Sequence, residues 1–264
     1  MINYSLQKGA LAFGCARLES LSNKMSSRII EECLNNNILH FDTAPSYGSE
    51  SLIGDILRGV DGSTITSKVG LPRESSNNLF RKIYKRSIKK FAHIAPSIKN
   101  KIHLSLNKNS INYEQRVLGI DEIMFDLEKT LTNINRSKLD ILLVHEPNQF
   151  LIDYDLIEIF ETLKKQGLIE NYGLGYGRST SQLIEFGNVR QVLYQEGKIE
   201  TKSSINIVHG LIRASLSKGN TGVQHSQFIN NFMLKNQNAS VLFSASSIKP
   251  VSYTHLRAHE TLQH

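Results

Sequence analysis

Short apolar runs alternate with longer stretches of helical periodicity along most of the chain. The apolar runs predict seven strands, at Ala10–Ala16, Ile38–Ala44, Thr64–Gly70, Leu139–Glu146, Ile169–Tyr176, Ser204–Ile212 and Val241–Ser246. The helical periodicity predicts helices at Ser26–Asn37, Glu50–Arg58, Ile120–Asn133, Asp155–Gln166 and Thr180–Glu196. This alternation is typical of βαβ units that build a parallel sheet. We therefore expect an α/β fold of the (β/α)8 TIM-barrel type.

The pattern supplies one strand fewer than a closed barrel requires, because such a barrel has eight. The shortage falls between Gly177 and Ser240. Either an eighth strand lies within Arg190–Tyr194, or one βα unit is shortened or missing. The pattern alone leaves both alternatives open.

Length and composition are those of one large globular core. With 264 residues, of which 40% are hydrophobic, we expect a single barrel domain over residues 1–250. Residues 72–113 form a long insertion after the third strand, and Arg73–Lys108 within it contains ten Lys or Arg residues against one acid, Glu74. Phe80, Ile83, Tyr84, Ile88 and Phe91 recur there at helical spacing, which indicates a basic amphipathic helix.

The basic insertion is interpreted first as a solvated segment and second as an attractor of an anionic substrate or of cofactor phosphates. No motif for nucleic-acid or membrane-surface binding accompanies it, so neither partner is expected. No run approaches the roughly 18 apolar residues of a spanning helix, and no signal peptide is evident, which favours a cytoplasmic protein. Cys15 and Cys33 are too few for a disulfide framework and are expected as reduced thiols.

The last segment, residues 251–264, reads VSYTHLRAHETLQH and lacks the apolar periodicity of a helix that closes a barrel. The sequence of this segment resembles a recurrent non-native C-terminus that arises in cloning or sequencing read-through. We therefore expect the natural C-terminus to be missing from this sequence, with the barrel incomplete at that end.

Three of the predicted strands carry a polar residue near the carboxyl end. In each strand, every second side chain points to the same face, and the polar residue shares its face with the residues two and four positions before it. These residues are Asp42, Lys68 and His145. Because the carboxyl ends of barrel strands form one rim, the three side chains should meet there. Tyr47 follows Asp42 by five residues and can lean over the same rim, whereas His40 is interpreted as inward-facing structure.

These four residues suggest a tuned proton donor beside a polarised carbonyl. A free tyrosine has a pKa of about 10, and a nearby ammonium such as that of Lys68 should lower the pKa of Tyr47. Asp42 would keep Lys68 charged and oriented, and His145 would hydrogen-bond the carbonyl of a substrate. Tyr47 would then protonate the carbonyl oxygen.

Four runs of the sequence, HFDTAPSYGSESLIGDIL, TITSKVG, LDILLVHEP and IENYGLGYG, resemble in order the strand motifs of the aldo/keto reductase family. The resemblance covers roughly Ala10 to Ser247, and the motifs are most similar to those of aldose or galactose dehydrogenase-like members. It implies hydride transfer between NADPH or NADH and a small-molecule aldehyde, ketone or sugar. The family's catalytic tetrad corresponds to Asp42, Tyr47, Lys68 and His145.

The resemblance also suggests where the cofactor would bind. Gly175 and Tyr176 stand where the family commonly has Ser-Asn to hold the nicotinamide carboxamide, so that contact must be altered. His209 corresponds roughly to the family's aromatic residue that stacks on the nicotinamide. The run VLFSASSIK resembles the last strand and phosphate-binding turn, which implicates Ser244, Ser246 and Ser247. The preference for NADP over NAD rests on family habit.

Two other functions stay open from the sequence. His40, Asp42, Lys68 and His145 are also the kind of residues found in a metal-dependent barrel hydrolase, but the first strand lacks the histidines of that class, and no metal is expected. The altered Gly175-Tyr176 pair keeps open a non-catalytic NAD(P)-binding regulator or an inactive remnant. The pattern does not predict an oligomeric state.

Overall fold

The computed structural model describes residues 10–71, 73, 117–177, 185–196 and 205–248. Within these ranges eight parallel strands form a closed barrel in sequence order, and β8 pairs with β1. The strands are β1 Leu11–Gly14, β2 His40–Asp42, β3 Thr64–Val69, β4 Leu139–His145, β5 Ile169–Gly175, β6 Val189–Leu193, β7 Ile205–His209 and β8 Ala239–Phe243. The expected (β/α)8 barrel is confirmed.

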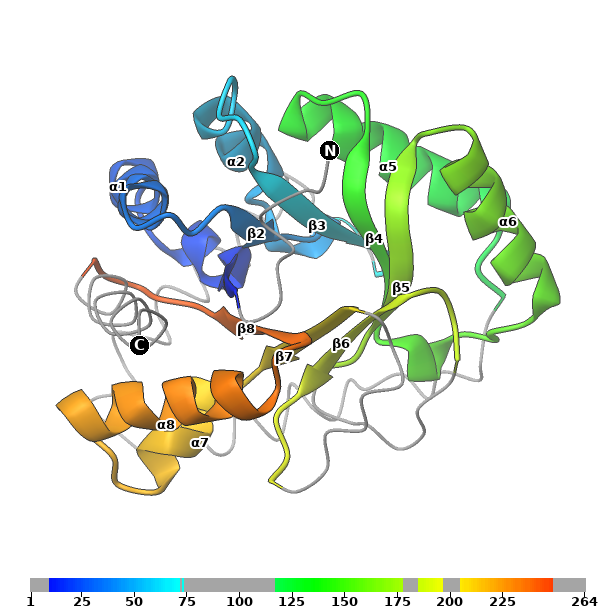
Figure 1. The fold of residues 1–264 in the computed structure, drawn as a ribbon. Helices are drawn as coiled ribbons and strands as arrows, with labels where there is room; N and C mark the ends of the chain where they lie inside the picture. Colours follow the sequence, from blue (N-terminus) through cyan, green and yellow to red (C-terminus); the bar gives the residue numbers. More distant parts are fainter. Residues whose placement is uncertain (1–9, 72, 74–116, 178–184, 197–204, 249–264) are drawn as a thin grey trace, which may run out of the picture.

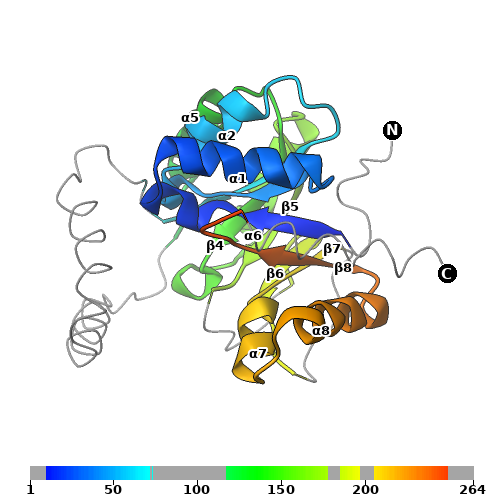
Figure 2. The same cartoon turned by 90° about the vertical axis from the view of Figure 1, so that its left-hand side faces the viewer.

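Helices surround the strands (Figure 1). They are α1 Asn23–Asn35, α2 Glu50–Ile56, α5 Ile120–Ile134, α6 Tyr154–Lys165, α7 Leu211–Ser217 and α8 Gly222–Lys235, with short 3-10 helices η2 Cys15–Ser20, η3 Pro45–Tyr47 and η4 Pro147–Gln149. Helices α7 and α8 lie together on one side of the barrel, and α1 and α2 lie on another (Figure 2). None of the helices among the described residues is long and apolar enough to cross a membrane.

Local signals set the ends of several helices. The Ser22 hydroxyl accepts a hydrogen bond from the Met25 backbone N–H over 3.3 Å at the start of α1. Asp153 caps α6 in the same way through the Leu156 N–H at 3.0 Å. Asn135 ends α5 in the left-handed conformation, with φ 55°.

The region 177–240 differs from its expected pattern in two ways. The predicted helix Thr180–Glu196 is wrong at its C-terminal half, because Val189–Leu193 is strand β6, which lies between β5 and β7. The alternative of a strand within Arg190–Tyr194 is therefore confirmed, and the barrel lacks no strand. The predicted strand Ser204–Ile212 ends earlier, at His209, because Gly210 turns with φ 82° and α7 begins at Leu211.

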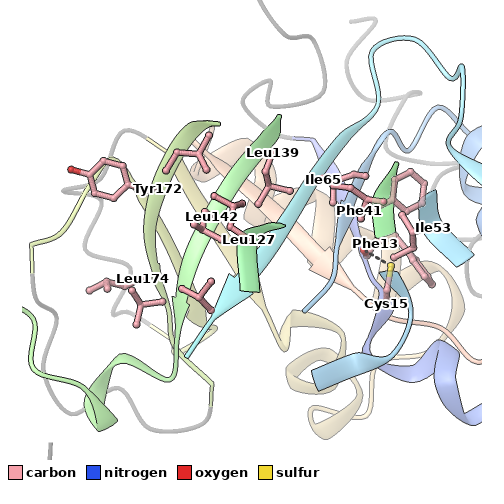
Figure 3. Packing of buried hydrophobic residues seen from close by; sticks show 14 of the residues in the cluster. Phe13, Cys15, Phe41, Ile53, Ile65, Leu127, Leu139, Leu142, Tyr172 and Leu174 are labelled. Carbon is pink, nitrogen blue, oxygen red and sulfur yellow. Dashed lines mark hydrogen bonds between the residues drawn. The ribbon is translucent and has the colours of Figure 1, made fainter. Parts of the chain in front are cut away.

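The core has an outer and an inner layer. The outer layer packs strand residues against helices, as Figure 3 shows for Phe13, Phe41 and Ile65 beside Ile53 of α2. The inner layer fills the barrel with Ala12, Ile141, Leu143, Val189, Ile207 and Leu242. Because the strands are covered on both faces, most of their residues are buried, polar ones such as Thr64 and Asn206 included.

The two cysteines are free and buried. The amphipathic helix predicted within the insertion and the tail 251–264 both lie outside the described residues.

Candidate active site

A pocket of about 720 Å³ opens at the carboxyl ends of the strands. Its lining includes all four residues expected at this rim, Asp42, Tyr47, Lys68 and His145. Asp42 and His145 end β2 and β4, Lys68 lies one residue before the end of β3, and Tyr47 ends η3. The register of the parallel strands thus brings together residues that lie up to about a hundred positions apart in the sequence.

The ammonium of Lys68 lies 2.7 Å from each carboxylate oxygen of Asp42 and 2.9 Å from the Thr43 carbonyl oxygen. Both side chains are almost fully buried. Burial is the largest single influence and lowers the pKa of Lys68, but the charge of Asp42, the nearby Tyr47 and the hydrogen bonds to both side chains together raise it more, so that the net shift is upward. Lys68 is therefore a fixed positive charge, and its three donors are all satisfied.

Tyr47 lies directly beside this ion pair. The Lys68 Nζ atom is 4.9 Å from the centroid of the Tyr47 ring. Burial raises the pKa of Tyr47, while the Lys68 ammonium lowers it and the Asp42 carboxylate raises it. The net shift is upward, so the expected lowering of this pKa is wrong, because the cost of burying a phenolate exceeds the attraction of the ammonium. Tyr47 is a protonated phenol at neutral pH.

His145 completes the group. Its ring lies edge-on to that of Tyr47, with centroids 5.8 Å apart and an interplanar angle of 87°. Burial and the nearby Lys68 charge lower the pKa of His145 to about 3. The imidazole is therefore neutral and can donate one hydrogen bond to an acceptor in the pocket.

Gln191 of β6 is a polar residue of the pocket that the sequence did not predict. Its Nε2 atom donates to Asp42 Oδ2 over 3.0 Å, and the side chain is buried. The helix predicted over Thr180–Glu196 obscures the alternation of Val189, Gln191 and Leu193. Read as a strand, that alternation places a polar residue near a carboxyl end, which is the signal that identified Asp42 and Lys68.

The residues proposed to contact the nicotinamide occupy neighbouring strand ends. Gly175 ends β5, and a Cβ atom there would lie 3.2 Å from Gln191 Oε1. The Tyr176 N–H donates to the Gln191 carbonyl oxygen, and the Tyr176 carbonyl oxygen lies 2.9 Å from His209 Nε2. All three residues line the pocket. His209 is thus held by the backbone of Tyr176, and stacking on a nicotinamide stays a prediction.

The three serines after β8 do not share one position. Ser244 lines the pocket and packs so closely on Gly14 that a Cβ atom there would lie 2.6 Å from its hydroxyl oxygen. Ser246 and Ser247 are exposed and are not among the residues that line the pocket. Only Ser244 is therefore brought to the site.

Three charged residues of the pocket were missed: Arg17 in η2, Glu146 after β4, and Arg213 in α7. Arg17 and Arg213 lie just beyond predicted strands, where no alternation assigns a side chain to the pocket. Glu146 ends the predicted strand Leu139–Glu146, but the alternation assigns it to the face opposite His145. Among the described residues, no group of three or more His, Cys, Asp or Glu side chains is arranged to hold a metal ion.

A closed parallel barrel whose polar residues converge at the carboxyl ends of the strands defines the class of (β/α)8-barrel proteins with a site at that face. Within this class, the chain belongs to the aldo/keto reductase family, whose model matches residues 6–195. No curated protein matches the sequence.

Solved structures share the fold at low identity. An aldo-keto reductase from Bacillus halodurans in its holo form is 18% identical with a TM-score of 0.65, and a putative aldo-keto reductase from Pseudomonas aeruginosa is 15% identical with a TM-score of 0.64. Each comparison covers 96% of this chain and 90% of the other. An aldo/keto reductase from Klebsiella pneumoniae, solved in complex with NADP and acetate, is 15% identical with a TM-score of 0.58, over 96% and 89% of the two chains.

Proposed function

We propose that the chain is an NAD(P)-dependent oxidoreductase that interconverts an aldehyde or ketone, sugars included, with the corresponding alcohol. The observation that carries this proposal is the meeting of a protonated Tyr47, the Asp42–Lys68 ion pair and a neutral His145 at one pocket. Membership of the aldo/keto reductase family supports the reaction class.

The residues present fit a nicotinamide dinucleotide. The pocket volume is within the range of small-molecule sites. Arg17 and Arg213 follow β1 and β7, on either side of β8, and Ser244 follows β8 itself, which gives an anionic phosphate group two cations and a hydroxyl. The Klebsiella pneumoniae relative was solved with NADP. When bound, the nicotinamide would supply or accept the hydride.

On the side of the tetrad, Gln191 and the backbone of Gly175 are the polar groups that would meet the carboxamide of the cofactor. Gly175 leaves the space in front of Gln191 Oε1 clear, since a Cβ atom there would come within 3.2 Å of that oxygen. Compared with the Ser-Asn pair of the family, the Gly175-Tyr176 pair therefore lacks the two side chains that would contact the carboxamide. The amide oxygen of Gln191 remains in the pocket.

The chain's own residues divide the remaining chemistry. His145 donates a hydrogen bond to the carbonyl oxygen of the substrate and fixes its position. Tyr47 gives its hydroxyl proton to that oxygen as negative charge develops there, because an alkoxide is a stronger base than a phenolate. Lys68 then stabilises the phenolate through its charge, and Asp42 holds Lys68 in place.

Purified protein tests this proposal with NADPH or NADH and a panel of aldehydes, followed by the absorbance of the reduced cofactor. Tyr47→Phe should abolish turnover while fluorescence titration shows that NADPH still binds. Tyr154→Phe is the matched control, because Tyr154 is 77% exposed and should leave turnover unchanged. Turnover that survives in Tyr47→Phe would contradict the assigned proton donor.

A non-catalytic NAD(P)-binding regulator is the second candidate, favoured by the Gly175-Tyr176 pair, whose backbone and buried aromatic ring offer no polar side chain apart from the Tyr176 hydroxyl. Binding of NADPH without turnover of any aldehyde by the wild-type chain would support this candidate. Absence of both binding and turnover would instead indicate an inactive remnant.

A further inference from the structure

Tyr47 lies in a short turn whose two ends are held together by hydrogen bonds. The hydroxyl oxygens of Thr43 and Ser49, which flank the turn, are 3.0 Å apart, and both side chains are buried. The Tyr47 N–H donates to the Ala44 carbonyl oxygen at 2.9 Å. Lys68 Nζ donates to the Thr43 carbonyl oxygen at 2.9 Å, which connects the first end of the turn to β3. The position of Tyr47 therefore depends on what holds the other end, at Ser49.

Glu50 follows Ser49 directly, begins α2 and is 3% exposed. Its carboxylate accepts hydrogen bonds from Thr130 Oγ1 over 2.7 Å and from Asn133 Nδ2 over 2.9 Å, both on α5. Arg73 Nη1 donates to Glu50 Oε2 over 2.7 Å. Charge-assisted hydrogen bonds of this kind are short and strong, so the first residue of α2 is fixed in place.

Ser67 connects the same carboxylate to β3. Its hydroxyl donates to Glu50 Oε1 over 3.4 Å, and the side chain is fully buried. Because side chains alternate along a strand, Ser67 faces the helices, whereas Lys68, the next residue, faces the pocket. Glu50 thus lies three residues after Tyr47 and is bonded to the residue that precedes Lys68.

Arg73 joins α2 to α5 through this carboxylate. Its Nε atom donates to Asp126 Oδ1 over 2.9 Å, and its Nη2 atom donates to the Asp126 carbonyl oxygen and, over 2.9 Å, to Thr130 Oγ1. The Glu50 side chain is 4% exposed and that of Arg73 is 20% exposed, so the ion pair is largely shielded from water. A planar guanidinium that binds two carboxylates at once fixes the two helices relative to each other.

The distance between Tyr47 and Lys68 has a chemical consequence. Lys68 Nζ lies 4.9 Å from the centroid of the Tyr47 ring, and its charge opposes the rise that burial causes in the pKa of Tyr47. Glu50 faces the helices rather than the pocket, so it would act on this pKa by holding Tyr47 in place rather than through its own charge.

We propose that Glu50, held by Arg73, is a positioning residue that keeps the ring of Tyr47 against the ammonium of Lys68. The catalytic consequence of this role rests on the proposed function, whereas the contact itself can be measured without turnover. When Glu50 is released, Tyr47 moves away from Lys68 and loses part of the attraction that favours the phenolate. The titration of Tyr47 then moves to higher pH.

Two arginines provide matched variants for the test. Arg73→Met removes the cation that faces Glu50, whereas Arg136→Met removes an ion pair of 3.1 Å with Asp140 and the hydrogen bonds to Ser63, which lies just before the amino end of β3. The arginine side chains are 20% and 23% exposed, so both substitutions perturb a similarly shielded cation. Both variants should unfold at a lower temperature, but only Arg73→Met should affect Tyr47.

The absorbance of phenolate is followed against pH for each full-length variant. Subtraction of the curve for the same variant with Tyr47→Phe isolates the titration of Tyr47, and circular dichroism at each pH shows that the chain is folded. In Arg73→Met this titration should move upward by about half a pH unit or more, which corresponds to an increase of about 2 Å in the distance from the Lys68 charge. Ser67→Ala should give a smaller shift in the same direction, because it removes only the link between Glu50 and β3.

Turnover supplies the second measurement, with an aldehyde that the wild-type chain reduces and saturating cofactor. Arg73→Met should lower kcat by about tenfold or more and leave KM unchanged, because a displaced proton donor affects the chemical step rather than substrate binding. The alkaline limb of kcat should move upward together with the phenolate titration. Arg136→Met should leave both kcat and this limb unchanged.

A folded Arg73→Met variant in which Tyr47 titrates as in the wild-type chain would overturn the inference, and so would an equal shift in Arg136→Met. Where Arg73→Met does not stay folded at alkaline pH, Ser67→Ala decides: an upward shift supports the positioning role, and an unchanged titration overturns it. A wild-type chain that reduces no aldehyde contradicts the proposed function, but the phenolate titration still decides whether Glu50 positions Tyr47.

Discussion

Gln191 donates a hydrogen bond to Asp42 Oδ2 over 3.0 Å and thereby joins β6 to the ion pair that β2 and β3 form with each other. Asp42 consequently receives buried donors from two directions, and the amide of Gln191 is fixed beside Gly175. This contact connects the proposed acid–base residues with the side of the pocket proposed for the nicotinamide.

The first prediction concerns that contact. Gln191→Met keeps the volume of the side chain but removes the donor, and we expect it to lower the free energy of unfolding by about 1–3 kcal/mol, as for hydrogen bonds to charged groups. Urea unfolding followed by circular dichroism measures the change. Gln224→Met, on the exposed face of α8, is the control and should change stability by less than about 0.5 kcal/mol. Equal effects of the two variants would argue against a stabilising role for the bond.

The second prediction concerns the buried ion pair. Lys68→Met leaves the Asp42 carboxylate buried without its main partner, so we expect a loss of about 3–5 kcal/mol in unfolding free energy. Adding Asp42→Leu removes the isolated charge and should recover part of that loss. Chemical denaturation of the two single variants and the double variant gives the coupling energy. A double variant as unstable as the sum of the single variants would show that the two charges do not stabilise each other.

The third prediction concerns the pH dependence of reduction. The pKa of His145 is lowered to about 3 and that of Tyr47 is raised above its ordinary value of about 10. His145 is therefore neutral and Tyr47 protonated across the neutral range, and kcat should show no inflection near pH 6.5. Turnover should fall only in the alkaline range, as Tyr47 loses its proton. A basic limb near pH 7 would contradict the raised pKa of Tyr47.

The fourth prediction concerns acid stability. Burial lowers the pKa of His40 to about 4, and its Nε2 atom lies 2.8 Å from Thr66 Oγ1 inside the barrel. Below pH 6.5 the His40 imidazole is protonated in the unfolded chain but stays neutral in the folded chain. The contribution of His40 to the free energy of unfolding is therefore fully present above pH 6.5 and falls as the pH drops toward 4. His40 alone contributes a loss of up to about 3 kcal/mol, and His145 adds to it with the same sign.

Unfolding in urea at pH 7 and pH 4.5 measures this acid loss, and His40→Gln should reduce it. The half-buried His225 is the control position, because His225→Gln removes a less shielded imidazole and should reduce the loss less. An unchanged pH dependence in His40→Gln would rule out His40 as a source of acid sensitivity.

The fifth prediction contrasts Gly173, inside β5, with Gly177, two residues after that strand ends. A Cβ atom at Gly173 would lie 1.7 Å from the Val189 backbone carbonyl oxygen, which belongs to a paired strand and cannot yield. A Cβ atom at Gly177 would instead meet the carboxylate of Glu146. We expect Gly173→Ala to destabilise the fold by about 1–3 kcal/mol or more, whereas Gly177→Ala should displace Glu146 at a smaller cost. Thermal unfolding of both variants decides; similar melting temperatures would contradict the contrast.

Much of the fold and the centre of the candidate site could be predicted from local pattern. Strands buried on both faces show as apolar runs, and an alternation of two assigned Asp42, Lys68 and His145 to the inner face of three of them. The strand Val189–Leu193 could not be recognised with the same certainty, because its residues also fit a helix and only pairing with β5 and β7 distinguishes the two. Because this strand was not assigned, Gln191 was not predicted as a residue of the pocket.

The sequence by itself determined seven of the eight strands and the meeting of Asp42, Lys68 and His145 at their carboxyl ends, because both follow from the periodicity of neighbouring side chains. Tertiary structure alone decided the charge separation of the pocket and the direction in which its pKa values shift. Desolvation depends on how many atoms from distant segments surround a group, so the raised pKa of Tyr47 appears only once the barrel has closed around it. The position of Glu146 likewise depends on the absence of a side chain at Gly177, thirty-one residues away.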